Sequence, residues 1–252
     1  ASTFRGSIPG AAFFLLWVGI TLRCYGYRRT LVALLLLVTS PAFWYEATVR
    51  SDLLCNLMLV SGVLMFIDRR SLHIDSHPLM LGTACGLLLS TRIVVGIPLL
   101  IALLSQWLQA NNRSRTRFAI CCLTVFALTL LPFILWNPAQ TLTTDTSPLV
   151  LQVKQGTLWQ FLIVLATSIA FGYTSHTRTE RAFYTALTLL LLTTLSIVTR
   201  MVGDHFATPF FTPMYDLTYF GMALPFLIMT IATVDLTADT AHTKSNMAHF
   251  LH

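Results

Sequence analysis

Two types of side chain could do chemistry in this otherwise apolar chain, the guanidinium and the carboxylate. Arg50 and Asp52 lie two positions apart in a short polar segment between hydrophobic runs, where they can face a shared cleft. Arg92 separates two apolar stretches. A guanidinium binds phosphate oxygens through paired hydrogen bonds and keeps its charge beside lipid. The residue types therefore predict binding of a phosphate-bearing substrate near a carboxylate.

The same residues also allow simpler interpretations. Asp52 suits the N-cap or first turn of the helix that follows it, where the helix dipole favours a carboxylate. Arg92 can extend its side chain to lipid headgroups. Asp204 and His205 form a pair that suits a base or two metal ligands, but also an ordinary solvated loop. No third ligand follows at a standard spacing, so we predict no cofactor, and a divalent metal ion stays an alternative without support from the spacing.

The composition indicates which solvent surrounds the elements that carry these residues. Of the 252 residues, 55% are hydrophobic and only 10% are charged, whereas soluble domains carry about 25% charged residues. The sequence therefore predicts an all-α, polytopic transmembrane helical bundle over residues 1–235, followed by a flexible polar tail over residues 236–252. The net charge of +6 does not indicate nucleic-acid binding, because the basic residues lie in short loops between apolar runs.

The basic residues follow every second hydrophobic run. The four clusters are Arg23, Arg28 and Arg29; Arg69 and Arg70; Arg113, Arg115 and Arg117; and Arg178 and Arg181. Cytoplasmic loops of membrane proteins keep the positive charge, so this alternation predicts a cytoplasmic C-terminus and an N-terminus on the outer side. The loops between these basic clusters then lie on the outer side of the membrane. They contain the remaining polar candidates: Glu46, Arg50, Asp52, Arg92, Arg200, Asp204 and His205.

The apolar runs predict about nine membrane spans, with a range of eight to ten. The runs cover approximately residues 8–22, 30–48, 53–67, 78–108, 118–136, 158–173, 182–199 and 217–234. A helix needs roughly 20 residues to cross the hydrocarbon core, so the run 78–108 is too long for one span. The basic clusters before and after this run should both lie in the cytoplasm. The chain must therefore cross the membrane twice between them. We predict a tight helical hairpin that turns near Thr91 and carries Arg92 to the outer face.

Gly82 and Gly86 form a G-x-x-x-G pattern in the first half of this hairpin. Small residues four positions apart let two helices approach closely in a membrane. We expect them to pack against another helix of the same chain, with a dimer face as the alternative.

Four stretches of the chain carry a family resemblance. They are SPAFWYEATVRSDL at residues 40–53, GLLLSTRIVVGIPLL at 86–100, LPFILWNP at 131–138 and YDLTYFGMALPF at 215–226. Their order and spacing resemble the GT-C-type polytopic membrane glycosyltransferases of bacteria, especially the mannosyltransferase-like group. The resemblance implies a bacterial inner-membrane enzyme that takes a sugar from a polyprenyl-phosphate donor at the outer face.

The resemblance also implies roles for the outer-face residues. Asp52 would be the base that activates the acceptor. Arg50, Arg92 and Arg200 would hold the phosphate leaving group. Glu46, Asp204 and His205 are further outer-face candidates. Membrane lipids and the polyprenyl-phosphate sugar are the partners implied.

One departure from the family keeps other functions open. The family's characteristic acidic residue lies in the first outer loop, whereas the first acidic residue here is Glu46. Either that part of the family pattern is absent from this sequence, or the catalytic acid is missing. A non-catalytic structural subunit of a larger membrane complex is therefore the alternative. A secondary transporter ranks third, because charges lie mainly at the ends of the runs and no internal repeat is present.

Overall fold

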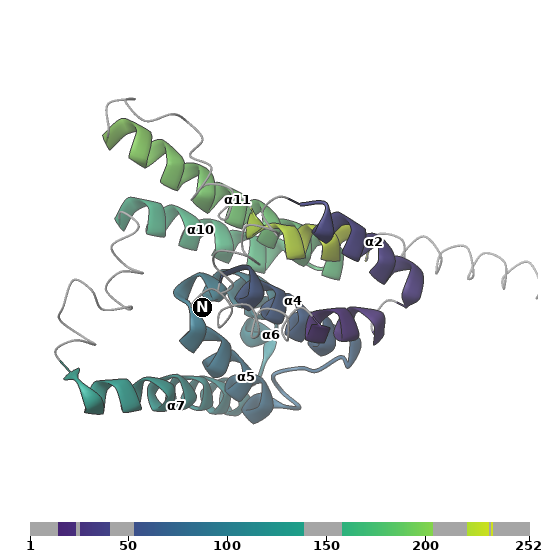
Figure 1. Cartoon of the computed structure of the whole chain (residues 1–252). Coiled ribbons are helices and arrows are strands. Elements are labelled where there is room, and N and C mark those ends of the chain that lie inside the picture. Colours follow the sequence, from purple (N-terminus) through teal and green to yellow (C-terminus); the bar gives the residue numbers. More distant parts are fainter. Residues whose placement is uncertain are drawn as a thin grey trace, which may run out of the picture.

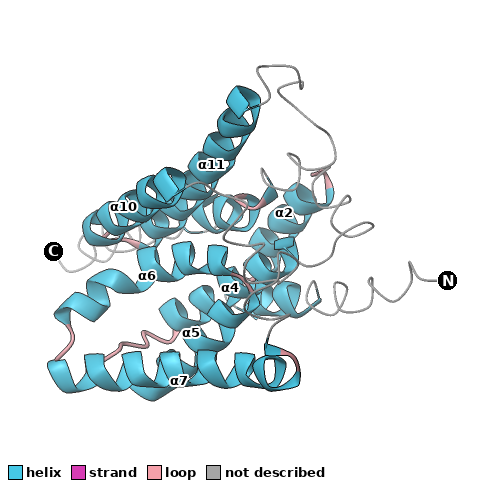
Figure 2. Cartoon of the chain, turned by 90° about the vertical axis from the view of Figure 1, so that its left-hand side faces the viewer, coloured by secondary structure: helices cyan, strands magenta, loops and turns pink. Residues whose placement is uncertain are grey.

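The computed structural model describes residues 15–23, 26–40, 53–138, 158–203, 221–231 and 233. Within these ranges the chain is helical and contains no strand (Figures 1 and 2). The predicted all-α class is therefore confirmed for the described part of the chain.

The helices have the following bounds. They are α2 (Tyr27–Val38), α4 (Leu53–Arg69), α5 (Pro78–Thr91), the 3-10 turn η1 (Ile93–Val95), α6 (Gly96–Gln109), α7 (Asn112–Trp136), α10 (Leu158–Thr174) and α11 (Arg178–Gly203). Residues 15–23 and 224–231 are also helical. The segment 15–23 is fixed by Trp17, whose indole nitrogen donates to the Ser61 hydroxyl of α4 at 3.0 Å.

The apolar run 78–108 is broken into two helices, as predicted. α5 ends at Thr91, and Arg92 has an extended backbone with φ −159° and ψ 143°. The hydroxyls of Ser90 and Thr91 donate to the carbonyls of Leu87 and Leu88, which competes with continuation of the helix. Pro98 is tolerated near the start of α6 because the first turn of a helix has no partner for a backbone N–H.

The two arms of this turn do not form the tight hairpin that the sequence predicted. α5 packs chiefly against α7, and α6 packs against α10 and α11. The physical reason is the glycine face of α5. A Cβ at Gly82 would lie 2.7 Å from the Phe118 carbonyl oxygen, and one at Gly86 would lie 2.6 Å from the Cys122 carbonyl oxygen. α7 therefore approaches α5 more closely than any side chain would permit.

These contacts confirm the intramolecular interpretation of the G-x-x-x-G pattern. They also show that α5 and α7 run parallel, because Gly82 lies beside Phe118 and Gly86 lies one turn further along beside Cys122. α10 and α11 run antiparallel, because Gln160 near the start of α10 donates to the Leu195 carbonyl near the end of α11 at 2.9 Å. Successive spans are predicted to cross the membrane in alternate directions. That order requires α5 and α7 to be parallel and α10 and α11 to be antiparallel.

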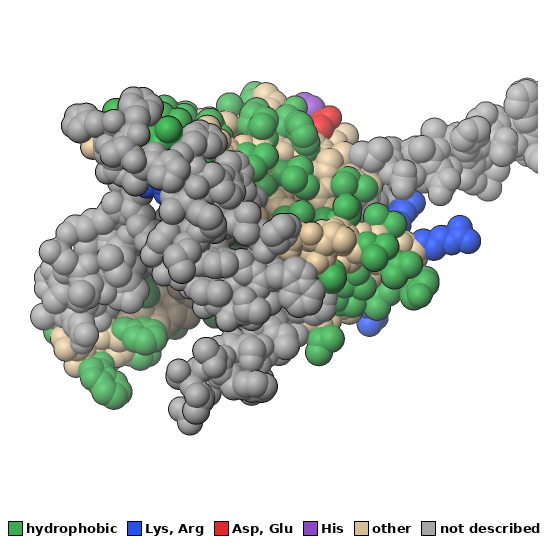
Figure 3. All heavy atoms as spheres, turned by 45° about the horizontal axis from the view of Figure 1, so that its top comes forward, with side chains coloured by type: hydrophobic (Ala, Val, Ile, Leu, Met, Phe, Trp, Pro, Cys, Tyr) green, Lys and Arg blue, Asp and Glu red, His purple; other side chains and the backbone are tan. Residues whose placement is uncertain are grey.

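Among the residues that the structure describes, two helices are long and apolar enough to cross a membrane by length and composition, α7 with 25 residues and α11 with 26. None of the most apolar 18 residues of α7 is buried, unlike the residues of a core helix in a soluble domain. Its exposed face carries large side chains: Ile120, Leu123, Leu128, Leu131, Phe133, Leu135 and Trp136. On the face drawn in Figure 3, hydrophobic side chains cover much of the described surface, and most of the visible Lys and Arg side chains lie at its right-hand edge.

Other described helices are shorter than a full span. α5 and α6 have 14 residues each, and α10 has 17, whereas crossing the hydrocarbon core takes roughly 20. The break at Arg92 accounts for the first two, because it divides one long apolar run. The count of about nine spans stays a prediction.

Candidate functional site

Two of the predicted site residues lie in the described part of the chain. Arg92 occupies the break between α5 and η1, and Arg200 lies in the last turn of α11. Both side chains are half-buried. The other predicted site residues lie outside the described residues: Glu46, Arg50, Asp52, Asp204 and His205.

Contacts between loops identify the end of the bundle where the basic clusters lie. The turn after α4 meets the start of α7, because Asp75 accepts hydrogen bonds from the backbone N–H and the side-chain amide of Asn111 at 2.9 and 2.8 Å. The end of α4 also meets the start of α11, because the Arg178 guanidinium donates to the Asp68 carbonyl. Three of the four basic clusters therefore share one end, which we call the basic end.

Arg92 and Arg200 lie away from this end. α5 and α11 both begin at the basic end, since α5 follows the turn that holds Asp75 and α11 begins with Arg178. Arg92 follows α5 and Arg200 ends α11. Figure 1 shows α7, which runs parallel to α5, and α11 both ending at the left of the molecule. Both described candidates therefore lie away from the basic clusters, but at different levels. Arg200 is in the last turn of α11, whereas Arg92 comes only six residues after Gly86, which packs beside Cys122 and Val125 in the middle of α7.

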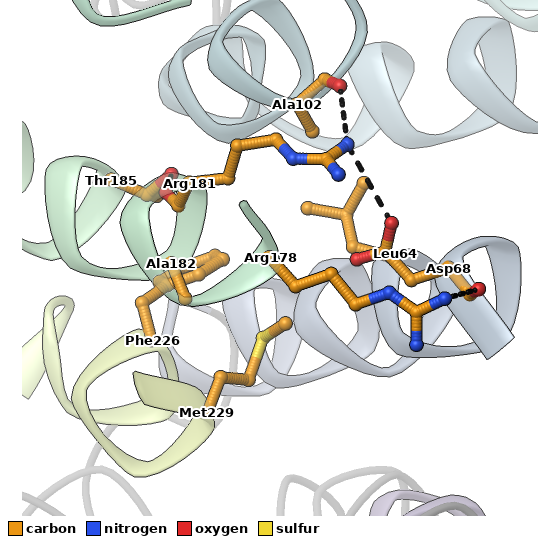
Figure 4. A pocket seen from close by; sticks show the side chains of 9 residues that line it. All are labelled: Leu64, Asp68, Ala102, Arg178, Arg181, Ala182, Thr185, Phe226 and Met229. Carbon is orange, nitrogen blue, oxygen red and sulfur yellow. Dashed lines mark hydrogen bonds and ion pairs between the residues drawn. The ribbon is translucent and has the colours of Figure 1, made fainter. Parts of the chain in front are cut away.

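A polar junction that the sequence analysis missed lies at the basic end (Figure 4). Arg181 forms an ion pair with Asp68 at 3.6 Å and donates to the Ala102 carbonyl of α6 at 3.3 Å. Arg178 donates to the backbone of Asp68. Three residues thereby connect α4, α6 and α11. We call Asp68, Arg178 and Arg181 the arginine junction.

Burial dominates the electrostatics of the arginine junction. The side chains of Arg181 and Asp68 are only 18% and 19% exposed. Asp68 follows the apolar run 53–67 and so lies beyond the predicted span. Its burial raises the pKa of the carboxyl, and the charges of Arg181 and Arg178 oppose that rise without cancelling it.

The arginine junction has no room for a substrate. The cavity lined by Asp68, Arg178, Arg181, Phe226 and Met229 has a volume of about 10 Å³, which is near the minimum for one water molecule. Both guanidinium groups already donate to acceptors of the protein. The junction is therefore suited to joining helices and not to catalysis.

The remaining described carboxylates also stabilise loops and helix ends. Glu180 accepts hydrogen bonds from the backbone N–H groups of His176 and Thr177, while the Thr177 hydroxyl accepts from the Glu180 N–H. This reciprocal pair is a capping box at the start of α11, and the spacing of Thr177 and Glu180 makes it readable from the sequence. Asp75 holds Asn111, whose side chain caps α7 through the Ser114 N–H.

A larger groove lies between α2 and the helix 224–231. It has a volume of about 240 Å³ and is lined by Arg28, Arg29, Val32, Ala33, Leu36, Ile228 and Ile231. The helix 224–231 also contributes Phe226 and Met229 to the arginine-junction cavity. The fourth basic cluster is therefore connected to the basic end as well.

Comparisons with known proteins do not assign this chain to a family. No protein-family model, no curated protein and no solved structure matches it. Among the residues that the structure describes, no group of three or more His, Cys, Asp or Glu side chains could hold a metal ion. The chemistry of the chain must therefore be argued from its own arginines and carboxylates.

Proposed function

We propose that this chain is a multi-pass protein of a bacterial inner membrane, with its basic end in the cytoplasm. The exposed apolar face of α7 supports membrane residence, because such a face is stable in lipid and not in water. The grouping of the basic clusters at one end supports the orientation. Membrane lipids are accordingly its nearest partners.

At the outer end, the proposed activity is transfer of a sugar from a polyprenyl-phosphate donor. The observation that carries this proposal is that Arg92 and Arg200 lie at the ends of α5 and α11 that point away from the basic clusters. Arginines there are not needed as cytoplasmic orientation signals, and their charge and paired donors suit a phosphate group. Asp52, with Arg50 and Glu46 nearby in sequence, would supply the base that activates the acceptor. Asp204 and His205 follow α11 and complete the set of candidates.

The sugar-transfer proposal is tested by replacing Arg92 with alanine. The full chain, reconstituted in liposomes, would be supplied with a radiolabelled polyprenyl-phosphate sugar and an extract of candidate acceptors. We expect R92A to reduce the transfer rate by about 10-fold or more, because a charge-assisted contact to the leaving phosphate is lost. R92K should recover part of the rate, because it keeps the charge but not the paired donors.

Arg117 supplies the matched control for this assay. It is an exposed arginine at the basic end, so R117A should transfer sugar at the unaltered rate. Equal rates for R92A and the unaltered chain would remove Arg92 from the site. Absence of transfer by the unaltered chain with every donor supplied would reject the enzyme proposal.

A second proposed function is that of a non-catalytic subunit of a larger membrane complex. The observation that favours it is again α7, where Leu135 and Trp136 are 73% and 91% exposed, because such a face can contact another protein as well as lipid. Light scattering on the chain isolated from native membranes in mild detergent measures the mass of the particle. The mass distinguishes an enzyme that acts alone from a subunit of a larger complex. A monomer that retains sugar transfer would reject the subunit proposal, whereas a stable complex without transfer would support it.

A further inference from the structure

The groove between α2 and the helix 224–231 combines charge with an apolar wall. Arg28 and Arg29 lie in the first turn of α2, and Val32 and Leu36 follow on the same helix. Ile228 and Ile231 line the groove from the helix 224–231, whose ribbon lies beside α2 in Figure 1. The lining includes no acidic side chain. The groove therefore combines two adjacent positive charges with an aliphatic surface.

The two guanidinium groups have no partner within the described structure. Neither Arg28 nor Arg29 forms a hydrogen bond or ion pair with another described residue. Adjacent like charges repel, and an anion at the mouth of the groove would relieve that repulsion. A guanidinium pair favours a phosphate oxygen group in particular, because of its planar donor geometry.

The volume and the lining of the groove indicate what the ligand contains besides a phosphate group. Closed pockets for soluble small molecules usually measure about 300–1,000 Å³, whereas this groove is open and has a volume of about 240 Å³. Its lining beyond the arginines is entirely aliphatic, so a polar metabolite would lose its hydrogen bonds to water there. A hydrocarbon chain has no such cost. The ligand must therefore carry a phosphate group at one end and an alkyl chain at the other.

We propose that this groove binds one anionic phospholipid of the cytoplasmic leaflet. Its phosphate lies between Arg28 and Arg29, and one acyl chain follows the groove past Val32, Leu36 and Ile228. Basic pockets between membrane helices on the cytoplasmic side favour such headgroups. The proposal rests on the membrane residence proposed above but not on sugar transfer, since the groove lies at the basic end.

The test measures lipid binding by the purified full chain in a non-ionic detergent. Native mass spectrometry would count dioleoyl phosphatidylglycerol and dioleoyl phosphatidylcholine bound from an equimolar mixture. The unaltered chain should form a one-to-one complex that prefers phosphatidylglycerol. R28A/R29A should lose that preference, with a binding constant for phosphatidylglycerol about 10-fold weaker or more. Circular dichroism should show unchanged helix content in both proteins.

Two matched controls keep the proposal open to refutation. R113A/R117A removes two exposed arginines at the same end of the bundle and should keep the preference. V32W narrows the groove and should weaken binding of phosphatidylglycerol, whereas L35W, on a residue of α2 that does not line the groove, should not. Unchanged binding by R28A/R29A, or an equal loss with R113A/R117A, would overturn the proposal. Displacement of the lipid by inorganic phosphate alone would overturn the role of the acyl chain.

Discussion

Replacing Gly86 with leucine is expected to lower the free energy of unfolding by about 3 kcal/mol. A Cβ at this position would lie 2.6 Å from the Cys122 carbonyl oxygen and 2.9 Å from the Val125 Cβ. The nearest atom belongs to the backbone of α7, so no rotation of a side chain can make room. The two helices must separate, and their interface loses its van der Waals contacts over several turns. Titration with sodium dodecyl sulfate in mixed micelles, followed by circular dichroism, measures the change.

Gly19 provides the control for the Gly86 prediction. It is a helical glycine, and a Cβ added to it would have no atom within 4 Å. The residue is also exposed. Leucine at position 19 should leave stability unchanged or raise it slightly, because leucine has the higher helix propensity. Equal stabilities for G86L and G19L would contradict close approach of α5 to α7.

Replacing Asp68 with leucine is expected to destabilise the chain by about 2 kcal/mol, because Arg181 would be left largely buried without its carboxylate. Arg181 has a side chain that is only 18% exposed, so solvent cannot fully compensate for the loss. The double variant D68L/R181M should recover most of that stability. Replacing a buried ion pair with apolar residues of similar volume often changes stability little, because the cost of burying two charges is removed together with their attraction.

A double-mutant cycle tests this prediction under the same unfolding conditions. The single variants D68L and R181M and the double variant are compared with the unaltered chain, and R117A reports the effect of removing an exposed arginine. Additive losses would show that Asp68 and Arg181 do not interact. A double variant less stable than either single variant would show that the arginine junction is a net source of stability.

Within the described part of the chain, the sequence contained enough information to predict that the apolar run 78–108 is divided into two helices. The break near Thr91 followed from the length of the apolar run and from the parity of the arginine clusters, and both are one-dimensional signals. The close packing behind Gly82 and Gly86 was predicted as intramolecular, but its partner was not. Choosing α7 over α6 depends on which helix offers a complementary backbone surface, and spacing within α5 contains no such information.

The arginine junction was missed for a related reason. Asp68 precedes Arg69 and Arg70, so it looks like part of an ordinary loop, and Arg181 lies more than 100 positions away. Arg178 and Arg181 were interpreted as orientation signals, which explains their charge but not their contacts. A carboxylate at the end of an apolar run is a weak signal for a buried partner. Only the packing of α4 against α6 and α11 identifies which arginine that partner is.

The parallel arrangement of α5 and α7 has a consequence for biosynthesis. α5 leaves the ribosome first, and its glycine face has no partner until α6 has been made and α7 has followed it. At about 5–20 residues per second, that interval lasts several seconds. In the proposed membrane, the face of α5 that Cys122 and Val125 later occupy is open to lipid during this time. The close packing of α5 can therefore form only after α7 has been inserted, and not when α5 itself is inserted.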